Sequence, residues 1–423
     1  MDKRPSARIV TLGCRLNHAD SALLVSRLQS AGYALTDDSS ADAELIIVNC
    51  CAVTREAETK SRKMIARLRR SHPGARIIAA GCAAEADPEP LLSAGADKIL
   101  TNPGKKDPFA EFCGVKSSTL SPDNFRENAF ASFPFRTRAF IKVQEGCDNF
   151  CTYCIVPKLR GPSRSREFDE CIADCRRSIE NGIPEIVLTG VNTGNYRDGG
   201  HTLGDLVRAV SGIWGDFRIR FSSTEPHPGD LTLPQLIAEN SRLCRFLHVS
   251  MQHGSDNILR KMGRRYSAEE FASYVESARK LVPDIHIGTD FIVGFPGETE
   301  KDFSDALGLL KKISFSNIHG FAYSPRPGTP AAEMPGRPAP QAVKERMDEL
   351  LRVADESAKK FALSQCGKTL PVIFEQIDRR SGKLTGWSDN YLEVAVDPCG
   401  TDCGKIVNIE AKRENLCLLN NNA

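Results

Sequence analysis

The stretch Cys147-Asp148-Asn149-Phe150-Cys151-Thr152-Tyr153-Cys154 decides the architecture and the chemistry of this chain. Its three cysteines have the spacing C-x3-C-x2-C, which suits one iron–sulfur cluster. They leave one iron of a [4Fe–4S] cubane without a protein ligand, because four thiolates would complete the set. An iron with an open position can bind and activate a substrate. A zinc knuckle or simple buried cysteines are the alternatives, but zinc needs a fourth ligand and the nearest histidines, His72 and His201, lie far off in the sequence.

The cysteine spacing, with the aromatic Tyr153 just before the last cysteine, resembles the signature of the radical S-adenosylmethionine (SAM) enzymes. This resemblance implies that Cys147, Cys151 and Cys154 hold a [4Fe–4S] cluster and that SAM chelates the open iron. An electron from such a cluster cleaves SAM to a 5′-deoxyadenosyl radical. The resemblance therefore implies an external electron donor as a partner.

Length and composition set broad limits. The 423 residues are enough for two to four domains, and the net charge of +2 means that any nucleic-acid surface must be a local patch. The chain has 15 cysteines but opens with MDKRPSARIVTLGC, which lacks the apolar core of a signal peptide. Reduced, metal-binding cysteines in the cytoplasm are the better interpretation. No apolar run reaches the roughly 18 residues of a membrane span, so we expect a soluble, cytoplasmic protein without a membrane partner.

The first domain, predicted over 1–125, alternates strand-like runs with helical patterns. The runs ARIVTLGC, ELIIVNCC and RIIAAGC predict an α/β domain with a doubly wound parallel sheet. Each run ends in cysteine, and ligands sit outside the carboxyl ends of parallel strands. Cys14, Cys82 and one of Cys50 and Cys51 should therefore converge in one crevice. Three thiolates there indicate a second cluster with an open iron, unless the cysteines are merely buried residues.

A second resemblance concerns the same segments. TLGCRLN at 11–17, VNCCAVTREAETKSR at 48–62 and GCAAE at 81–85, taken with CDNFCTYC, resemble the methylthiotransferases, radical SAM enzymes that insert a methylthio group. That family usually reads Asn-Thr-Cys in the second segment, so Cys51 matches the ligand and Cys50 replaces threonine. Adjacent side chains on a strand point to opposite faces, so only one of the two thiols reaches the crevice easily. The resemblance implies a second [4Fe–4S] cluster on Cys14, Cys51 and Cys82, and a source of sulfur.

The second domain, predicted over 133–364, follows a Pro-, Ser- and Asn-containing segment at 103–138 that is typical of a linker. Six strand-like runs, each before a helical stretch, predict a partial (β/α)6 radical SAM barrel with its chemistry at the carboxyl ends of the strands. These runs are AFIKVQEG, EIVLTGVN, FRIRFSST, FLHVSMQ, HIGTDFIVG and NIHGFAYS.

Several strand ends match the family's SAM-binding positions. A glycine in the segment at 189–192 would let the backbone approach the ligand closely, although tight-turn chemistry alone also explains glycines such as those at 294–298. Ser223 and Glu225 could bond the ribose hydroxyls, and Gln252 is a further polar candidate. The expected SAM contacts are Tyr153, Thr189, Gly190, Asn192, Ser223, Glu225, Gln252, Gly294 and Gly297.

Basic residues gather in one predicted helix. Residues 55–72 carry seven Arg or Lys against two Glu at helical spacing, which suits either a phosphate backbone or a solvated face, and the family favours RNA. The candidates are Lys60, Arg62, Lys63, Arg67, Arg69 and Arg70. Basic loops could contact phosphates or simply face solvent; their members are Arg160, Arg164, Arg166, Arg260, Lys261, Arg264 and Arg265.

The last part begins with a predicted helix at 341–365 and continues, over 365–423, with short β-runs typical of a small β-barrel. In the family this position holds an RNA-binding TRAM domain. Seven Lys or Arg against eight Asp or Glu in 366–423 give no basic patch, so stacking on Trp387 or Tyr391 is the remaining route to RNA. We interpret Cys171, Cys175, Cys399 and Cys403 as structural.

The resemblance covers nearly the whole chain. Within the family it is nearest to the branch that methylthiolates C2 of N6-threonylcarbamoyladenosine at position 37 of tRNA, which implies the anticodon loop as a partner. The alternatives are the branches that act on isopentenyladenosine or on a ribosomal protein aspartate. From a different class, the chain could be an iron–sulfur RNA-binding protein without catalysis.

Overall fold

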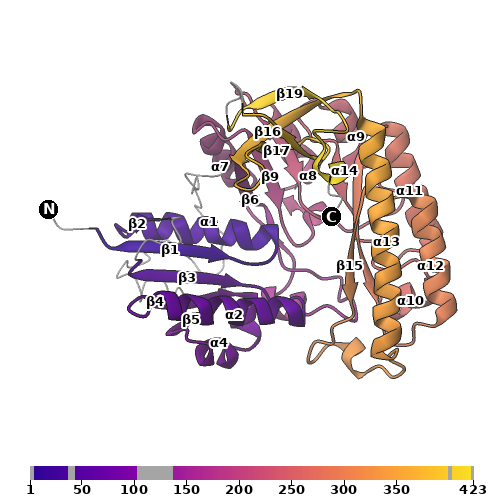
Figure 1. Ribbon diagram of the computed structural model, residues 1–423, viewed down its shortest axis with the longest axis horizontal. Coiled ribbons are helices and arrows are strands. Elements are labelled where there is room, and N and C mark those ends of the chain that lie inside the picture. Colours follow the sequence, from indigo (N-terminus) through magenta and orange to yellow (C-terminus); the bar gives the residue numbers. More distant parts are fainter. Residues whose placement is uncertain (1–3, 37–42, 102–136, 399–402, 421–423) are drawn as a thin grey trace.

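The computed structural model describes residues 4–36, 43–101, 137–398 and 403–420. Figure 1 shows an N-terminal α/β layer, a central barrel and a small C-terminal sheet above that barrel. Residues 103–136 of the predicted linker, and Cys399, lie outside the described residues. Within the described ranges, no helix is both long and apolar enough to cross a membrane.

The N-terminal sheet is entirely parallel, as predicted, and has the strand order β2-β1-β3-β4-β5. Apolar side chains of α1 pack on one face, and those of α2 pack on the other, so the sheet is covered on both sides. The order reverses between β1 and β3, which places a crevice at their carboxyl ends. The elements are β1 Ser6–Thr11, α1 Arg15–Ser30, β2 Ala34–Leu35, β3 Leu45–Cys50, α2 Arg55–Ser71, β4 Arg76–Gly81, α3 Cys82–Ala86, α4 Glu89–Ser93 and β5 Lys98–Leu100.

All six predicted barrel strands form. They are β6 Arg138–Lys142, β9 Glu185–Thr189, β12 Arg218–Phe221, β13 Phe246–His248, β14 His286–Val293 and β15 Asn317–Ala322. Parallel pairing gives two three-stranded sheets, β12-β9-β6 and β13-β14-β15, and parallel bridges Ile219–Leu243 and Thr224–Val249 connect them. No pairing among the described residues joins β15 to β6, so the barrel is partial.

Helices surround the barrel. They are α6 Val156–Arg160, α7 Phe168–Glu180, α8 Leu203–Ser211, α9 Thr232–Glu239, α10 Asp256–Lys261, α11 Ala268–Leu281 and α12 Glu300–Ile313. Short pieces complete the connections: β7 Gln144–Glu145, β8 Arg164–Ser165, β10 Arg197–Asp198, β11 His201–Thr202, and the 3₁₀ turns Thr193–Asn195 and Pro330–Glu333.

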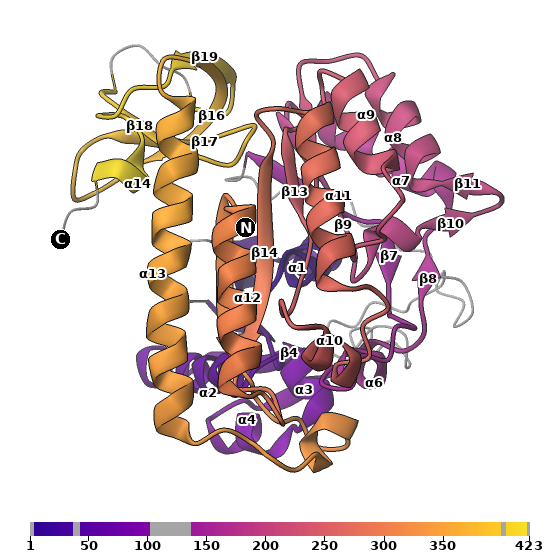
Figure 2. The same ribbon diagram turned by 90° about the vertical axis from the view of Figure 1, so that its right-hand side faces the viewer.

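Two helices cover the open edges of the barrel. The predicted long helix forms as α13, Pro340–Gln365, and runs along β15 (Figure 1); Figure 2 shows it beside α12. It approaches so closely that a Cβ on Gly320 would lie 2.8 Å from the Leu350 side chain. At the opposite edge α1 packs against β6, where the rings of His18 and Phe140 stack with centroids 5.3 Å apart. The first domain therefore packs on the barrel along the edge that lacks a neighbouring strand.

The C-terminal part is a four-stranded antiparallel sheet with the order β18-β17-β16-β19. Its elements are β16 Thr369–Ile377, β17 Leu384–Ser388, β18 Glu393–Val396, β19 Ile406–Glu410 and α14 Cys417–Asn420. One bridge between Val394 and Leu416 brings the chain after β19 back beside β18. The structure thus supports a small antiparallel β-sheet.

A buried carboxylate organises the contact between this sheet and the barrel. Glu185 is fully buried and pairs with Arg138 and Arg220 at 3.0 Å and with Arg218 at 2.5 Å. Burial alone would raise the pKa of Glu185, but the three guanidinium groups hold it well below its usual value. Arg218 and Arg220 also donate to carbonyl oxygens of the C-terminal sheet, those of Pro371, Trp387, Ser388 and Asp389.

Glu185→Gln should therefore loosen the C-terminal sheet, because removing one partner of a buried ion cluster costs roughly 3–5 kcal/mol. Trp387 reports on this interface, and Trp214→Phe removes the other tryptophan, which is 94% exposed. We expect the urea midpoint of Trp387 fluorescence to fall in Glu185→Gln. The matched exposed variant Asp305→Asn should leave it unchanged.

The same variant should show a defined pH dependence. The pKa of Glu185 in the folded protein lies below the unfolded value of about 4.3. Its ion pairs therefore contribute fully to the free energy of unfolding above about pH 4.3, and this contribution is lost as the pH falls through the folded pKa. The stability difference between the two proteins should therefore be largest at neutral pH and shrink below about pH 4. A difference that grows in acid would contradict this assignment.

Candidate active site

The three cysteines of the central motif lie on one loop at the carboxyl end of the first barrel strand, between β7 and α6. Hydrogen bonds hold the loop from two directions. Thr152 donates its backbone N–H to Met262 at 3.0 Å and its hydroxyl to the Lys261 carbonyl at 2.8 Å, and it accepts from the backbone N–H of Ala331 at 2.9 Å. Phe150 has a left-handed backbone with φ 48° and is 69% exposed.

The thiols of this loop are close neighbours in an apolar setting. Burial, together with the neighbouring Cys151 and Cys147 thiols, raises the pKa of Cys154 to about 12. Burial also raises the pKa of Cys147. Such thiols lose their protons when a metal binds them, so the donor set fits an iron–sulfur cluster. In the described part of the chain, no group of three His, Cys, Asp or Glu side chains is placed to hold a single metal ion.

Arg264 joins the cysteine loop to the next strand ends. Its guanidinium lies 3.3 Å from the Cys151 sulfur, 2.5 Å from the Glu225 carboxylate and 2.9 Å from the Ser250 carbonyl. With 8% of its surface exposed, Arg264 is neither a phosphate contact nor a solvated side chain, so both sequence interpretations of this residue are wrong. Its partner Glu225 keeps 22% of its side chain exposed and so remains open to a ligand.

The candidate SAM residues fall into two groups. Tyr153, Ser223, Glu225 and Gln252 are partly exposed. By contrast, Thr189 and Asn192 are fully buried, although their side-chain polar atoms have no hydrogen-bond partner among the described residues. Orphaned polar atoms of this kind call for a water or ligand contact.

Glycines at these strand ends have packing reasons. A Cβ on Gly190 would lie 2.9 Å from the carbonyl and side-chain oxygens of Gln144, so the close approach there is to Gln144. Gly294 and Gly297 have φ of 80° and 77°, which L side chains rarely adopt. The loop that they form is closed by Glu298, which accepts from Gly294 N at 2.6 Å and from Arg346 Nη1 at 2.9 Å.

The N-terminal cysteines converge at the predicted crevice. Cys14 caps α1, Cys82 opens α3, and Cys51 directly follows β3. Only Cys50 is itself a strand residue, which corrects the expectation that each strand ends in cysteine. Burial, together with the Cys14 and Cys82 thiols, raises the pKa of Cys51 to about 12. These three thiols are therefore neighbours. A Cβ on Gly13 would lie only 2.7 Å from that of Cys51.

Cys50 also lies near Cys82, whose thiol adds to the effect of burial in raising its pKa, but its other contacts differ from those of Cys51. It is fully buried, its thiol donates to the Val48 carbonyl at 3.3 Å, and it lies near Ser61 of α2. Burial raises its pKa to about 12 as well. The two adjacent thiols therefore have different surroundings, and Cys51 is the one that lies beside Cys14.

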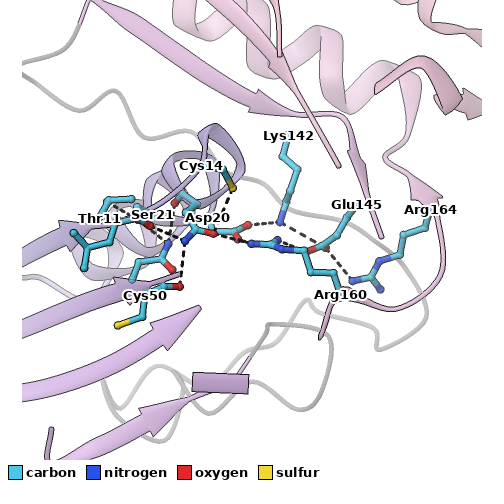
Figure 3. A network of polar contacts seen from close by, with 12 residues as sticks. Thr11, Cys14, Asp20, Ser21, Cys50, Lys142, Glu145, Arg160 and Arg164 are labelled. Atoms are coloured by element: carbon cyan, nitrogen blue, oxygen red, sulfur yellow. Dashed lines mark hydrogen bonds and ion pairs between the residues drawn. The ribbon is translucent and has the colours of Figure 1, made fainter. Parts of the chain in front are cut away.

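A buried network of ion pairs lies between the two cysteine sites and joins the elements that carry them. Lys142 of β6 pairs with Asp20 of α1 at 2.7 Å, and Arg160 of α6 pairs with Asp20 at 3.0 Å and with Glu145 at 2.8 Å. Figure 3 shows Lys142 and Arg160 reaching from the barrel side toward Asp20. Arg160 also donates to Asn17 at 2.8 Å. Arg160 and Arg166 are buried, so neither contacts phosphates nor faces solvent, contrary to both sequence interpretations.

A cleft of about 530 Å³ opens between the first domain and the carboxyl end of the last barrel strand. Cys51, Gly13 and the start of α2 line one wall, and residues 321–325 line the other. The backbone N–H of Arg55 donates to Ser324 Oγ at 3.2 Å, and Arg326 pairs with Glu58. This volume is typical of pockets for small-molecule groups.

The candidate RNA helix forms as α2, with Thr54 as its N-cap. Arg69 differs from its neighbours, because its guanidinium is taken up by the carbonyls of Gly95 and Ala75 and by Asp97. The other five candidates are exposed, namely Lys60, Arg62, Lys63, Arg67 and Arg70, and so are Arg55, Glu56 and Ser71 of the same helix.

The C-terminal aromatics pack inward. The ring of Tyr391 packs at a tilt against Phe246, with centroids 4.8 Å apart, and against Trp387, also at 4.8 Å. Phe246 and His286 begin their barrel strands, so the C-terminal sheet sits at the amino ends of β13 and β14, opposite the cysteine loop. Tyr391 is therefore an interface residue.

Two family models match the chain. The Radical SAM superfamily model covers residues 141–310, and the model described as Uncharacterized protein family UPF0004 covers residues 6–101. The threonylcarbamoyladenosine tRNA methylthiotransferase MtaB of Thermotoga maritima is 37% identical over 395 residues, spanning 92% of this chain and 90% of that protein. This chain belongs to the methylthiotransferase family of radical SAM enzymes. It is therefore a transferase, and its superfamily uses a [4Fe–4S] cluster and SAM.

Other relatives divide between two names. The MtaB protein of Bacillus subtilis is 32% identical, covering 95% of this chain and 92% of that one. The tRNA-2-methylthio-N(6)-dimethylallyladenosine synthase of Cereibacter sphaeroides is 34% identical, covering 95% and 94%. Among solved structures, the radical SAM methyltransferase TsrM of Kitasatospora setae aligns with a TM-score of 0.57 at 15% identity, covering 78% of this chain and 77% of that one, and confirms the fold.

The different surroundings of the adjacent cysteines give a testable prediction for this methylthiotransferase. Cys51→Ala should remove about half of the iron, because a three-thiolate site loses a ligand that it cannot replace. It should leave SAM cleavage to 5′-deoxyadenosine intact and stop methylthio product formation. Iron analysis and product chromatography on the reconstituted protein measure both.

Cys50→Thr is the matched control. Threonine is close in size to cysteine and is the family's usual residue here, so this variant should keep the iron and the product of the wild type. The reverse result for the two variants would assign Cys50 as the ligand.

Proposed function

We propose that this chain is a tRNA methylthiotransferase that adds a methylthio group to C2 of N6-threonylcarbamoyladenosine at position 37, beside the anticodon. The names of the Thermotoga maritima and Bacillus subtilis relatives support this substrate. The observation that carries the reaction is the placement of Cys51, near Cys14 and Cys82, at a cleft against the carboxyl end of the last barrel strand. There a sulfur donor and a radical generator would act on one base.

The residues divide into three roles in this proposal. Cys147, Cys151 and Cys154 hold the SAM-binding cluster, and Cys14, Cys51 and Cys82 hold a second [4Fe–4S] cluster. When bound, the first cluster and SAM supply the radical that removes the C2 hydrogen, and the second supplies sulfur. The proposed SAM contacts are Tyr153, Ser223, Glu225 and Gln252, with Thr189, Gly190, Asn192, Gly294 and Gly297 shaping the strand ends. An external electron donor and a sulfur source complete the proposed partners.

The chain itself orients these groups. Arg264 fixes Glu225 beside Cys151, which would set the ribose of SAM relative to the cluster loop. Phe321 is 41% exposed at the cleft and offers an apolar wall for the target base. Arg55 lines the same cleft, where Lys60 pairs with Glu56 at 2.7 Å, and the Arg55 guanidinium would suit the carboxylate of a threonylcarbamoyl group.

The domain limits are part of the proposal. We place the N-terminal methylthiotransferase domain at 1–125, the radical SAM core at 133–364 and a TRAM-like RNA-binding domain at 365–423. The limits at 125 and 133 lie outside the described residues. The antiparallel order of β16 to β19 supports a TRAM-like domain.

The isopentenyladenosine branch is the second candidate, because dimethylallyladenosine synthases are 34% identical to this chain over 95% of its length. The two substrates differ in charge: a threonylcarbamoyl group carries a carboxylate and a dimethylallyl group is apolar. The cationic lining of the cleft favours the first.

Nucleoside mass spectrometry of tRNA from cells lacking the gene tests the proposal. The methylthio derivative of threonylcarbamoyladenosine should disappear while its precursor accumulates, and a plasmid copy of the gene should restore it. Loss of the isopentenyladenosine derivative instead would assign the second candidate. No change in either nucleoside would contradict a tRNA function.

The exposed face of α2 is the proposed contact with the tRNA backbone. Arg67 and Arg70 point to solvent, whereas Arg69 is held by the fold. The slope of log affinity against log salt is negative. If each arginine binds one phosphate, replacing Arg67 and Arg70 by Gln should make this slope shallower by roughly 1.5. Filter binding of tRNA across a salt series measures this slope.

Arg69→Gln is the control for that experiment. It should lower the thermal stability of the first domain, because it removes the bonds to Gly95, Ala75 and Asp97, and should leave the slope unchanged. An unchanged slope in the double variant would show α2 to be a solvated face.

A further inference from the structure

Arg160 holds an unusual position between the two cysteine sites. It ends α6, the short helix that begins directly after the Cys147–Cys154 loop, so its backbone moves with that loop. The backbone N–H of Cys147 also donates to the carbonyl of Gly161, the next residue, at 3.2 Å. Its side chain nevertheless belongs to the other site, because it is 7% exposed and points into the first domain.

Three groups hold the guanidinium in place. Nη2 donates to Asn17 Oδ1 at 2.8 Å and to Asp20 Oδ2 at 3.0 Å, and Nη1 donates to Glu145 Oε1 at 2.8 Å. A fork with partners on three sides has little freedom to reorient. The ion pairs hold the Arg160 side chain in its charged form, since Asp20 and Glu145 outweigh the effect of burial on its pKa.

The same guanidinium reaches the N-terminal cysteines. It lies close enough to the Cys82 thiol to lower its pKa, against the larger opposing effect of burial. Its partner Asn17 lies 4.0 Å from the Cys14 sulfur and donates to the carbonyls of Leu12 and Cys50. One cationic side chain from the first cysteine loop therefore lies near a thiol of the second set and holds an amide beside another.

We propose that Arg160 is a positioning residue for the N-terminal cluster: it places its positive charge beside Cys82, holds Asn17 against Cys14 and fixes the first domain against the SAM-binding loop. The inference rests on the proposed second cluster at Cys14, Cys51 and Cys82. Positive charge and hydrogen bonds at the ligand sulfurs raise the reduction potential of an iron–sulfur cluster, and outer partners of this kind typically affect activity 10–100-fold.

The test uses the full chain with both clusters reconstituted. Arg160→Gln removes the charge and the fork, and Arg160→Lys keeps the charge but loses the forked geometry. The control is Arg164→Gln, because Arg164 pairs with the same Glu145 at 3.1 Å from the other side, with 41% of its side chain exposed. Iron content, the potential of each cluster by redox titration with electron paramagnetic resonance, 5′-deoxyadenosine release and product formation are the readouts.

We expect both Arg160 variants to shift the N-terminal cluster to a more negative potential and to lower product formation about 10–100-fold. Release of 5′-deoxyadenosine should continue, and Arg164→Gln should stay near the wild type in potential and product. Wild-type potential in Arg160→Gln, with or without product, would overturn the proposal, since a purely structural link moves stability and not potential. If Arg160→Gln loses its second cluster, Arg160→Lys decides in the same way: a shifted potential supports the proposal and an unshifted one overturns it.

The iron content of the wild type separates this inference from the proposed function. A wild-type chain that binds only one cluster would remove the proposed second cluster itself, before any variant is compared. A wild type with two clusters and an Arg160 variant of unchanged potential would overturn the role of Arg160 alone.

Discussion

The buried ion network between α1 and the start of the barrel is the constraint on which the arrangement of this enzyme depends. Charges inside a protein are stable only when they are paired, and here each partner comes from a different part of the chain. Asp20 belongs to the first domain, whereas Lys142, Glu145 and Arg160 belong to the barrel. Lys142 and Arg160 hold the pKa of Asp20 below its usual value against the opposing effect of burial. The charges are satisfied together only when α1 packs on β6, so the docking of the two domains and the relation of the cysteine sites are one structural event.

This docking brings two carboxyl edges toward one another. In the first domain the cysteines lie in the turns after β1, β3 and β4, where a doubly wound sheet binds its ligands. In the barrel the cysteine loop and the partly exposed polar residues lie at the carboxyl ends of the strands, where barrels of this kind place their chemistry. Family membership gives the reaction class, a transferase that uses radical SAM chemistry. The cleft beside Cys51, between the first domain and the end of the last barrel strand, is where we propose that the substrate group binds.

Local sequence patterns predicted the helices and strands well. What they missed depends on contacts between residues far apart in the sequence. The six barrel strands, α2 and α13 were predictable because their apolar periodicity and flanking turns are local signals. The sequence predicts Arg160 and Arg264 as surface cations, because a charged residue in a loop gives no local sign of a buried partner. The partner Asp20, for example, precedes Arg160 by 140 residues. The choice of Cys51 over Cys50 as the candidate ligand needed the family pattern, because the residues alone do not distinguish two adjacent cysteines. Likewise, nothing in 366–423 indicates that Tyr391 packs against Phe246 at the amino ends of the barrel strands.

The most direct measurement follows one hydrogen atom. A tRNA anticodon stem-loop carrying N6-threonylcarbamoyladenosine with deuterium at C2 of position 37 is incubated with the reduced, reconstituted enzyme and SAM, and both products are analysed by mass spectrometry. Our account predicts one deuterium in 5′-deoxyadenosine for each methylthiolated nucleoside formed. Release of 5′-deoxyadenosine without deuterium, alongside an unmodified nucleoside, would contradict it.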